Sequence, residues 1–136
     1  METQEAMTSF SDRTSGPLIL LVEDNAINAR LVKEILMANG YRITHAKDGL
    51  QGVETAREVR PDLILMDLQL PRLDGISATR IIKADPSTAG IPIVALTAHA
   101  LDDHRQQMLA SGCCEYVTKP ISYQPFLDMI ARVLHG

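Results

Sequence analysis

A short aliphatic run at residues 63–66 ends abruptly in an acidic residue, Asp67. Pro61 and Asp62 precede the run, and a loop that contains Pro71 follows it. Four aliphatic residues between turn-forming residues indicate a strand that is buried on both faces. The carboxylate after such a strand lies on a rigid base at the edge of a core, where open α/β sheets place their functional groups. The rest of the chain is interpreted as providing neighbours for Asp67.

Four more segments favour strands, and a segment with helical spacing follows each of the five strands. The other strands are predicted at residues 18–22, 41–46, 91–96 and 115–117, and the helices at about 25–38, 48–60, 74–83, 101–111 and 122–134. Strands that alternate with helices predict a parallel sheet joined by right-handed crossovers. We therefore expect an α/β fold: a doubly wound, five-stranded parallel sheet of order 2-1-3-4-5 with helices on both faces.

Helical spacing also predicts which side chains face the core. Steps of three and four residues place one apolar face on the first helix and another on the last. The predicted faces are Ile27, Leu31, Ile35 and Ala38 in the first helix, and Phe126, Ile130 and Leu134 in the last.

The composition indicates one soluble globular domain over residues 17–136, preceded by a flexible polar tail at residues 1–16. Apolar residues make up 46% of the chain and charged residues 22%, which is ordinary for a globular protein. The net charge of −4 and the absence of a basic cluster argue against nucleic-acid binding. No apolar run approaches the roughly 18 residues of a membrane span. The adjacent Cys113 and Cys114 cannot form a disulfide framework, which favours the reducing cytoplasm.

Polar residues follow four of the five predicted strands. These residues are Glu23 and Asp24 after the first strand, Asp67 after the third, Thr97 after the fourth and Lys119 after the fifth. The carboxyl ends of parallel strands meet at one edge of the sheet, so we expect these groups to converge. In the order 2-1-3-4-5 the first and third strands are neighbours, which places Asp24 and Asp67 within a few ångströms of each other.

Converging carboxylates repel each other. Two charges about 4 Å apart cost roughly 4 kcal/mol at an effective dielectric constant near 20, so one carboxylate is expected to have a raised pKa. A divalent cation removes this repulsion, and oxygen ligands with several waters suit Mg²⁺. With Lys119 adding positive charge, the site could bind a phosphoryl group, and Asp67 becomes a candidate to form an aspartyl-phosphate.

Together these residues resemble the signature of the CheY-like receiver domains of two-component response regulators. The match includes Glu23-Asp24, Asp67, Thr97-Ala98 and Lys119-Pro120, in register from about Leu18 to Leu134. The resemblance implies a flavodoxin-like (βα)5 fold. It also implies that Asp67 accepts a phosphoryl group from a histidine kinase or phosphotransfer protein in a reaction that needs Mg²⁺ or Mn²⁺. Such a chain is a phosphorelay signalling protein rather than an enzyme, although it assists its own phosphorylation and dephosphorylation.

The resemblance also implies the metal ligands. Glu23, Asp24, Asp67 and the backbone carbonyl of Gln69 would hold the ion, with Asp24 preferred as a direct ligand and Glu23 acting through water. Lys119 would pair with the phosphoryl oxygens, and the Lys119–Pro120 bond is expected to be cis.

The same resemblance assigns switch and tuning residues. Thr97 would hydrogen-bond the phosphoryl group and Tyr116 would swing inward behind it. Gln69 and His99, two residues after Asp67 and Thr97, are expected to tune the access of water. The fourth helix, fifth strand and fifth helix form the expected output surface for a downstream protein, with contributions from Leu101, Met108 and Tyr116. The other histidines, His45, His104 and His135, are expected to face solvent and receive no role.

Several alternatives remain. The chain is similar both to single-domain, DivK-like regulators and, through residues 66–71, to receivers of hybrid kinases; the initial Met and the short tail favour a free-standing protein. A phosphate-independent scaffold would lack the acceptor or the lysine, and both are present. An Asp-nucleophile phosphatase usually has a second acid where this chain has Gln69, and a cap insertion. A flavodoxin-like electron carrier would have a phosphate loop after the first strand, which this chain lacks.

Overall fold

The computed structural model describes residues 16–98 and 102–135, so that only Gly16 of the expected tail lies among them. The strands are β1 (Leu18–Val22), β2 (Arg42–Ala46), β3 (Leu63–Asp67), β4 (Ile93–Thr97) and β5 (Glu115–Thr118). The helices are α2 (Ala26–Met37), α3 (Gly49–Val59), α4 (Gly75–Ala84), α5 (Asp102–Ser111) and α6 (Tyr123–His135).

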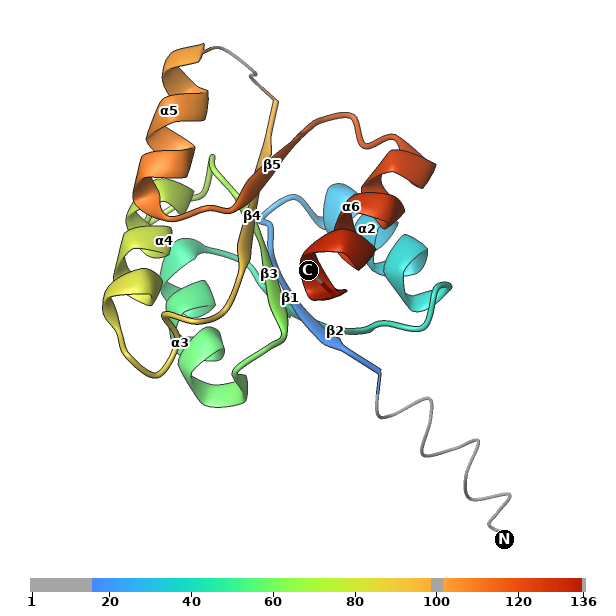
Figure 1. The fold of residues 1–136 in the computed structure, drawn as a ribbon, viewed down its shortest axis with the longest axis horizontal. Coiled ribbons are helices and arrows are strands. Elements are labelled where there is room, and N and C mark those ends of the chain that lie inside the picture. The colour runs from blue at the N-terminus through green and yellow to red at the C-terminus, as the bar shows by residue number, and fades with distance from the viewer. Residues whose placement is uncertain (1–15, 99–101, 136) are drawn as a thin grey trace, which may run out of the picture.

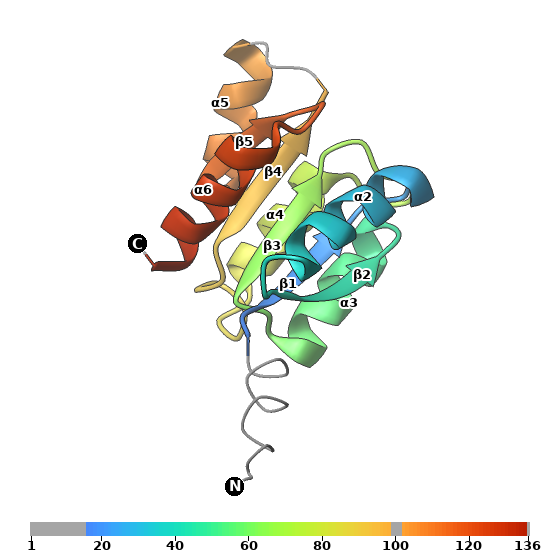
Figure 2. The same ribbon diagram turned by 90° about the vertical axis from the view of Figure 1, so that its right-hand side faces the viewer.

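The five strands form one parallel sheet of order β2-β1-β3-β4-β5, as the sequence predicts. Helices α2 and α6 cover one face of the sheet, and α3, α4 and α5 cover the other (Figures 1 and 2). Strands β1 and β3 lie side by side, with Val22 paired to Met66. The residues that follow these two strands therefore lie together at one edge of the sheet.

Alternate residues of the strands enter two separate cores. Leu20, Val22, Ile64 and Met66 pack toward α3, α4 and α5, while Ile19, Leu21, Leu63 and Leu65 pack toward α2 and α6. This period of two explains why β1 and β3 are continuously apolar, since both faces of a covered parallel sheet are buried. The central strands consequently form a rigid base for the residues at their ends.

The predicted apolar face of α2 is wrong for Ile27, Leu31 and Ala38, which are exposed, and holds for Ile35, which packs partly buried against the core. Ile27 is 79% exposed and Leu31 52% exposed, and the helix instead buries Ala29, Val32 and Leu36. Both sets of residues recur at helical steps, so periodicity alone does not choose between them. The short side chain of Ala29 fits against the sheet, and the larger Ile27 and Leu31 are left at the surface. In α6 the prediction holds for Phe126 and Ile130, which are buried, and Leu134 is half-buried.

Polar side chains cap the starts of three helices. Asn25, Asp48 and Asp74 accept hydrogen bonds from the backbone N–H groups of Asn28, Gln51 and Ser77, which satisfies donors that the first helical turn leaves unpaired. All three helix starts lie at the same edge of the sheet as the ends of β1, β2 and β3, so this capping also fixes the loops around Asp67.

Strand β4 begins at Ile93 rather than at residue 91. The N–H of Ile91 donates to the carbonyl of Thr88 in the preceding turn, which keeps it out of the sheet. At their other ends β3 and β4 continue through Asp67 and Thr97, so both polar residues belong to rigid strands. Among the described helices, none has the length and apolar character needed to cross a membrane.

Candidate functional site

Two acidic residues, Glu23 and Asp24, link β1 to α2. Only 1% of Glu23 is exposed, whereas Asp24 is exposed. Glu23 Oε2 accepts a hydrogen bond of 3.2 Å from the backbone N–H of Asn25, the residue that caps α2. The start of α2 therefore holds one carboxylate oxygen of Glu23, and the other oxygen faces Lys119.

Asp67 is the last residue of β3 and is 4% exposed. Its Oδ1 atom accepts a hydrogen bond of 3.1 Å from the backbone N–H of Gln69. Gly75, the first residue of α4, packs so closely that a Cβ atom there would collide with the Asp67 carbonyl oxygen. The loop after β3 thus holds the Asp67 carboxylate, and the start of α4 packs against the Asp67 backbone.

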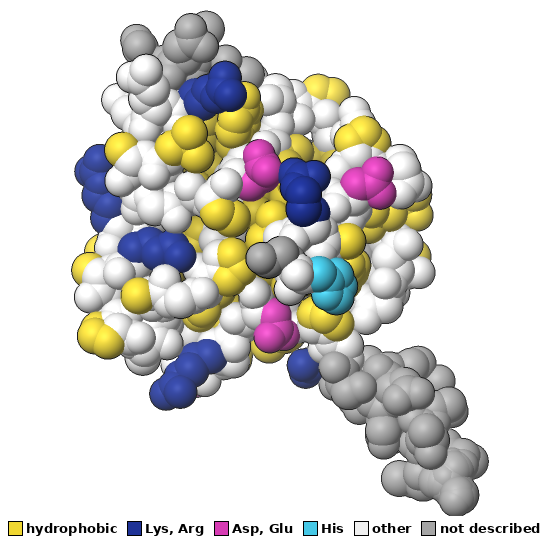
Figure 3. Space-filling view, in the orientation of Figure 1, with side chains coloured by type: hydrophobic (Ala, Val, Ile, Leu, Met, Phe, Trp, Pro, Cys, Tyr) yellow, Lys and Arg dark blue, Asp and Glu magenta, His cyan; other side chains and the backbone are white. Residues whose placement is uncertain are grey.

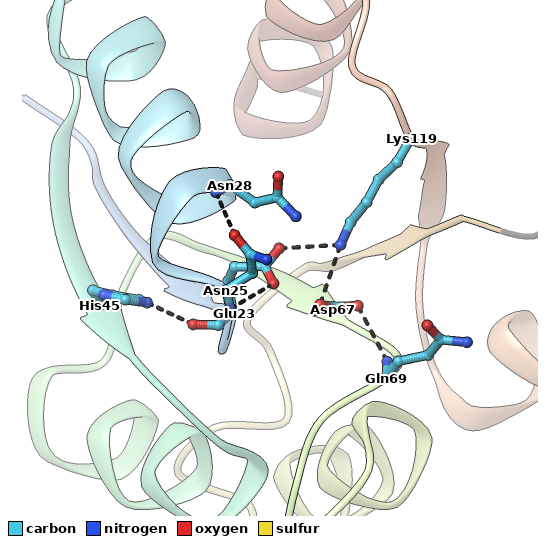
Figure 4. A network of polar contacts seen from close by, with 7 residues as sticks. All are labelled: Glu23, Asn25, Asn28, His45, Asp67, Gln69 and Lys119. Atoms are coloured by element: carbon cyan, nitrogen blue, oxygen red, sulfur yellow. Dashed lines mark hydrogen bonds and ion pairs between the residues drawn. The ribbon is translucent and has the colours of Figure 1, made fainter.

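Lys119 reaches the acids from the loop after β5. Its ammonium Nζ lies 3.1 Å from Glu23 Oε1 and 3.1 Å from Asp67 Oδ2 (Figure 4). Its backbone N–H donates to the Thr97 carbonyl at 2.7 Å, and the Lys119–Pro120 bond is cis, as predicted. A single cation therefore bridges the acid that follows β1 and the acid that ends β3.

The predicted convergence of the acids is confirmed. One carboxylate oxygen from each of Glu23, Asp24 and Asp67 can be chosen so that all three lie within 4.8 Å of one another. The loop after β1 and the end of β3 bring Asp24 and Asp67 together across 42 intervening residues, because the two strands are adjacent and parallel.

Burial is the main cause that raises the pKa of Glu23, from 4.5 to about 7. The Asp67 carboxylate raises this pKa further, while Lys119 and the Asn25 N–H oppose the rise. Burial also acts to lower the pKa of Lys119, but hydrogen bonds and charges from Glu23 and Asp67 outweigh it and raise that pKa. A raised pKa at one carboxylate is as predicted, although desolvation contributes more than the expected repulsion between charges.

The donor set fits a hard divalent cation. Three carboxylates in one cluster are the ligands that Mg²⁺ and Mn²⁺ prefer. They line a cavity, here called the acidic cavity, together with Gln69 and Lys119. When Glu23, Asp24 and Asp67 are ionised, their charges and that of Lys119 sum to −2, which one divalent ion offsets. Glu23, Asp24 and Asp67 are therefore the side chains that could hold a metal.

The expected switch residues lie on neighbouring strands. Thr97 ends β4 and is 5% exposed, and Tyr116 on β5 is half-buried and pairs with Ala95. The Arg105 guanidinium from α5 lies 5.4 Å from the centroid of the Tyr116 ring, a distance at which cation and ring attract each other. The structure brings Thr97 to the same edge as Lys119, while His99 lies outside the described residues.

The expected output surface needs one correction. Met108 on α5 is fully buried in the core with Cys113 and does not reach the surface. Helix α5 turns this side chain toward the sheet, and its position in a largely polar helix did not reveal that orientation. Leu101 lies outside the described residues. Between β5 and α6, a shallow cavity is lined by Tyr116, Phe126 and Met129 among others.

One residue near the site was missed by the sequence reasoning. His45 on β2 was expected to face solvent, but it is half-buried and its Nε2 atom lies 2.7 Å from the carbonyl oxygen of Glu23 (Figure 4). Its position next to the last residue of a strand beside β1 was the available signal. By contrast His135 is exposed, as predicted, and the His104 side chain lies outside the described part of the structure.

An apolar groove adjoins the acidic cavity. Leu31, Val32, Leu96, Pro120 and Ile121 line it together with Glu23, Asn28 and Lys119. The last three residues also line the acidic cavity. The groove and the cavity therefore adjoin, and the exposed Leu31 lines the groove.

Comparison with known proteins gives consistent matches. A family model described as the response regulator receiver domain matches residues 19–131. The polar-differentiation response regulator DivK of Brucella anthropi is 39% identical over 116 residues, which are 85% of this chain and 94% of that protein.

Solved structures agree with this match. The receiver domain of the sensor histidine kinase PA1611 from Pseudomonas aeruginosa, solved with a magnesium ion in its active site cleft, is 42% identical. Its TM-score is 0.84, over 90% of this chain and 100% of that chain. The manganese-bound form of response regulator Rcp1 is 30% identical with a TM-score of 0.73, over 86% of this chain and 91% of that chain.

Proposed function

The chain belongs to the response regulator receiver domain family, and we propose that it accepts a phosphoryl group on Asp67 in a metal-dependent phosphorelay. Support comes from one arrangement above all: Lys119 Nζ lies 3.1 Å from both Glu23 and Asp67, within a cluster of three acids. The similar proteins include both kinds that the sequence resembles: the response regulator DivK and the receiver domain of a sensor histidine kinase.

The proposed donor is a phosphohistidine on a histidine kinase or phosphotransfer protein. A carboxylate oxygen of Asp67 attacks the phosphorus, an O–P bond forms, and the N–P bond breaks. The imidazole nitrogen keeps the electron pair and takes up a proton. Asp67 is suited to this role because the Gln69 N–H holds Oδ1 and Lys119 holds Oδ2, which fixes the direction of both oxygens.

Lys119 and the metal ligands have separate tasks. Lys119 leaves the Asp67 carboxylate to pair with the incoming phosphoryl oxygens, where a fixed cation stabilises developing charge. Glu23, Asp24 and Asp67, with the Gln69 carbonyl as a further ligand, would hold Mg²⁺ or Mn²⁺, which would supply positive charge to offset the acids and the transferred group. Gln69, together with His99, sets the access of water and hence the lifetime of the phosphorylated state.

Phosphorylation is proposed to change the surface between α5, β5 and α6. Thr97 hydrogen-bonds the phosphoryl group and Tyr116 moves inward behind it. Moving such an equilibrium from mostly off to mostly on requires roughly 5 kcal/mol of differential stabilisation. The cavity beside Tyr116 is also lined by Phe126 of α6. Arg132 of α6 and Glu115 of β5, which line it as well, form an ion pair of 2.8 Å. A downstream protein would bind at this cavity.

The phosphoryl donor is proposed to cover the apolar groove beside Lys119. Leu31 and Asn28 line this groove, and Asn28 also lines the adjoining cavity that contains Asp67. Exposed apolar residues at such an opening provide contact area for a protein partner, and Ile27, one helical turn before Leu31, extends the same surface.

Protein partners are proposed, rather than nucleic acid. On the face drawn in Figure 3, the Lys and Arg side chains are spread singly among acidic, polar and apolar ones, so this face has no continuous basic surface. The free thiols of Cys113 and Cys114 are consistent with action in the reducing cytoplasm.

Incubation with acetyl phosphate and Mg²⁺, followed by intact-mass measurement, tests the proposal. Wild type should gain one phosphoryl group, and Asp67→Asn should gain none. Asp128→Asn is the matched control, because Asp128 is an exposed acid on α6 that bonds Gln124, and it should be labelled like wild type. Equal labelling of Asp67→Asn and wild type would rule out Asp67 as the acceptor.

A further inference from the structure

His45 fixes the backbone at the point where the acids follow β1. The Glu23 N–H donates to the Ala46 carbonyl at 3.0 Å, and the Glu23 carbonyl lies 2.7 Å from His45 Nε2. A carbonyl only accepts hydrogen bonds, so Nε2 carries the hydrogen and donates it. Both polar backbone groups of Glu23 are therefore held by β2.

The histidine ring acts where the sheet no longer supplies a backbone donor. After Ala46 the chain leaves β2, and the Lys47 N–H, which points away from β1 in the alternation of the strand, donates to Gln51 Oε1 at 2.6 Å. Asp48 then caps α3. The ring of His45 thus extends the pairing between β2 and β1 by one more hydrogen bond, at Glu23.

We propose that His45 is a positioning residue for the metal site, acting through the peptide group that joins Glu23 to Asp24. This inference rests on the metal-dependent function proposed above. The Glu23 carboxylate has two other partners, Lys119 and the Asn25 N–H. The exposed Asp24 carboxylate forms no hydrogen bond or ion pair with any other described residue, so its direction depends on the backbone.

The peptide carbonyl that His45 binds belongs to the same rigid plane as the Asp24 N–H. Rotation of this plane would turn the Asp24 side chain away from Asp67 and widen the acidic cluster. A hydrogen bond from a half-buried ring opposes that rotation before the metal arrives. Groups that orient metal ligands in this way commonly change metal affinity by 10–100-fold when they are removed.

Two variants of His45 separate this role from a general effect of the substitution. The amide nitrogen of Gln reaches about as far from the backbone as Nε2 of His, whereas that of Asn is one methylene shorter. We expect His45→Gln to bind Mg²⁺ within about threefold of wild type and His45→Asn to bind about tenfold more weakly. Isothermal titration calorimetry of the full chain with Mg²⁺ alone measures both affinities.

Arg42→Met is the matched control on the same strand. Arg42 Nε also donates from β2 to a backbone carbonyl, that of Gly16 at 2.7 Å, but at the opposite end of the strand. We expect its Mg²⁺ affinity to equal that of wild type. Urea denaturation of all variants without metal reports whether any of them loses stability.

A second measurement needs no metal. The ¹⁵N chemical shift of the Asp24 amide responds to the hydrogen bond on the Glu23 carbonyl, because both belong to one peptide group. We expect this shift to change in His45→Asn and to stay near the wild-type value in His45→Gln. Equal Mg²⁺ affinities of wild type, His45→Gln and His45→Asn would overturn the positioning role, as would equal loss in both variants. A wild-type chain that binds no Mg²⁺ would overturn the metal site itself and the role of His45 with it.

Discussion

Replacing Glu23 by Gln should stabilise the metal-free chain at pH 8, although it removes a candidate metal ligand. Glu23 is 1% exposed, and burial is the first cause that raises its pKa from 4.5 to about 7. Above pH 7 the folded chain therefore contains a poorly solvated carboxylate, which the unfolded chain would solvate fully. Gln has nearly the same shape and never ionises.

The size of the effect follows from the pKa. The difference between about 7 and 4.5, at about 1.36 kcal/mol per pH unit, gives an upper limit of about 3 kcal/mol. The pKa of about 7 already includes the opposing effect of Lys119. Because the amide of Gln must also fit beside the Lys119 ammonium, we expect a smaller gain of about 1–2 kcal/mol at pH 8. Between pH 4.5 and 7 the folded state binds more protons than the unfolded state, so this group makes wild-type stability fall as pH rises. Below pH 4.5 the advantage of Gln should vanish.

Urea unfolding with a chelator present, followed by circular dichroism at pH 4, 6 and 8, measures this advantage. Glu34→Gln is the control, because Glu34 is an exposed glutamate on α2 that pairs with Arg30 at 3.3 Å, and its stability change should vary little between these values of pH. Saturating Mg²⁺ should favour wild type, since a ligand that binds only the folded state stabilises it. A Glu23→Gln gain of equal size at pH 4 and pH 8, or a loss at pH 8, would refute the reasoning.

Three further substitutions separate the tasks of the site. Lys119→Met should slow labelling by acetyl phosphate about 100-fold and should strengthen Mg²⁺ binding in calorimetry, because it removes a positive charge beside the cation. Gly75→Ala should lower the free energy of unfolding by about 1–3 kcal/mol in urea, because its methyl group collides with the backbone of Asp67. Leu31→Glu should slow transfer from a phosphohistidine protein but leave acetyl phosphate labelling unchanged, whereas Leu50→Glu on α3, also exposed, should change neither.

Each of these predictions has a contrary result. Weaker Mg²⁺ binding by Lys119→Met would mean that the lysine supports the metal ligands instead of competing with the ion. A fully stable Gly75→Ala would show that the loop beside Asp67 adapts easily. Equal effects of the Leu31 and Leu50 variants on protein-to-protein transfer would show that the groove is not where the donor binds.

The strand order and the meeting of the acids were predictable because both follow from strong local patterns. Residues 63–66 and 18–22 are continuously apolar, as in a strand covered on both faces; Asp67 follows the first run, and Glu23 and Asp24 follow the second. Once the strands are parallel neighbours, Asp24 and Asp67 must approach each other. The capping side chains of Asn25 and Asp48 were equally visible, because capping depends on residues only three positions apart.

Features that depend on packing between distant elements were not predictable. Helical spacing allowed two faces of α2, and only the fit of Ala29 and Val32 against the sheet decided between them. The burial of Met108 depends on the rotation of α5 about its own axis, which decides which side chains face the sheet. The hydrogen bond from His45 to Glu23 depends on how the His45 ring turns toward the loop after β1, which no local pattern specifies.

The central claim is that Asp67 is the phosphorylated residue and that the acidic cluster needs a metal to make it so. Labelling with acetyl phosphate, reduction of the acyl phosphate with borohydride, and peptide mass spectrometry locate the modified residue, because reduction converts a phosphorylated aspartate to homoserine. We predict homoserine at position 67 when Mg²⁺ is present and none when it is chelated. Homoserine at Asp24 or elsewhere, or equal conversion of Asp67 with and without Mg²⁺, would contradict the account.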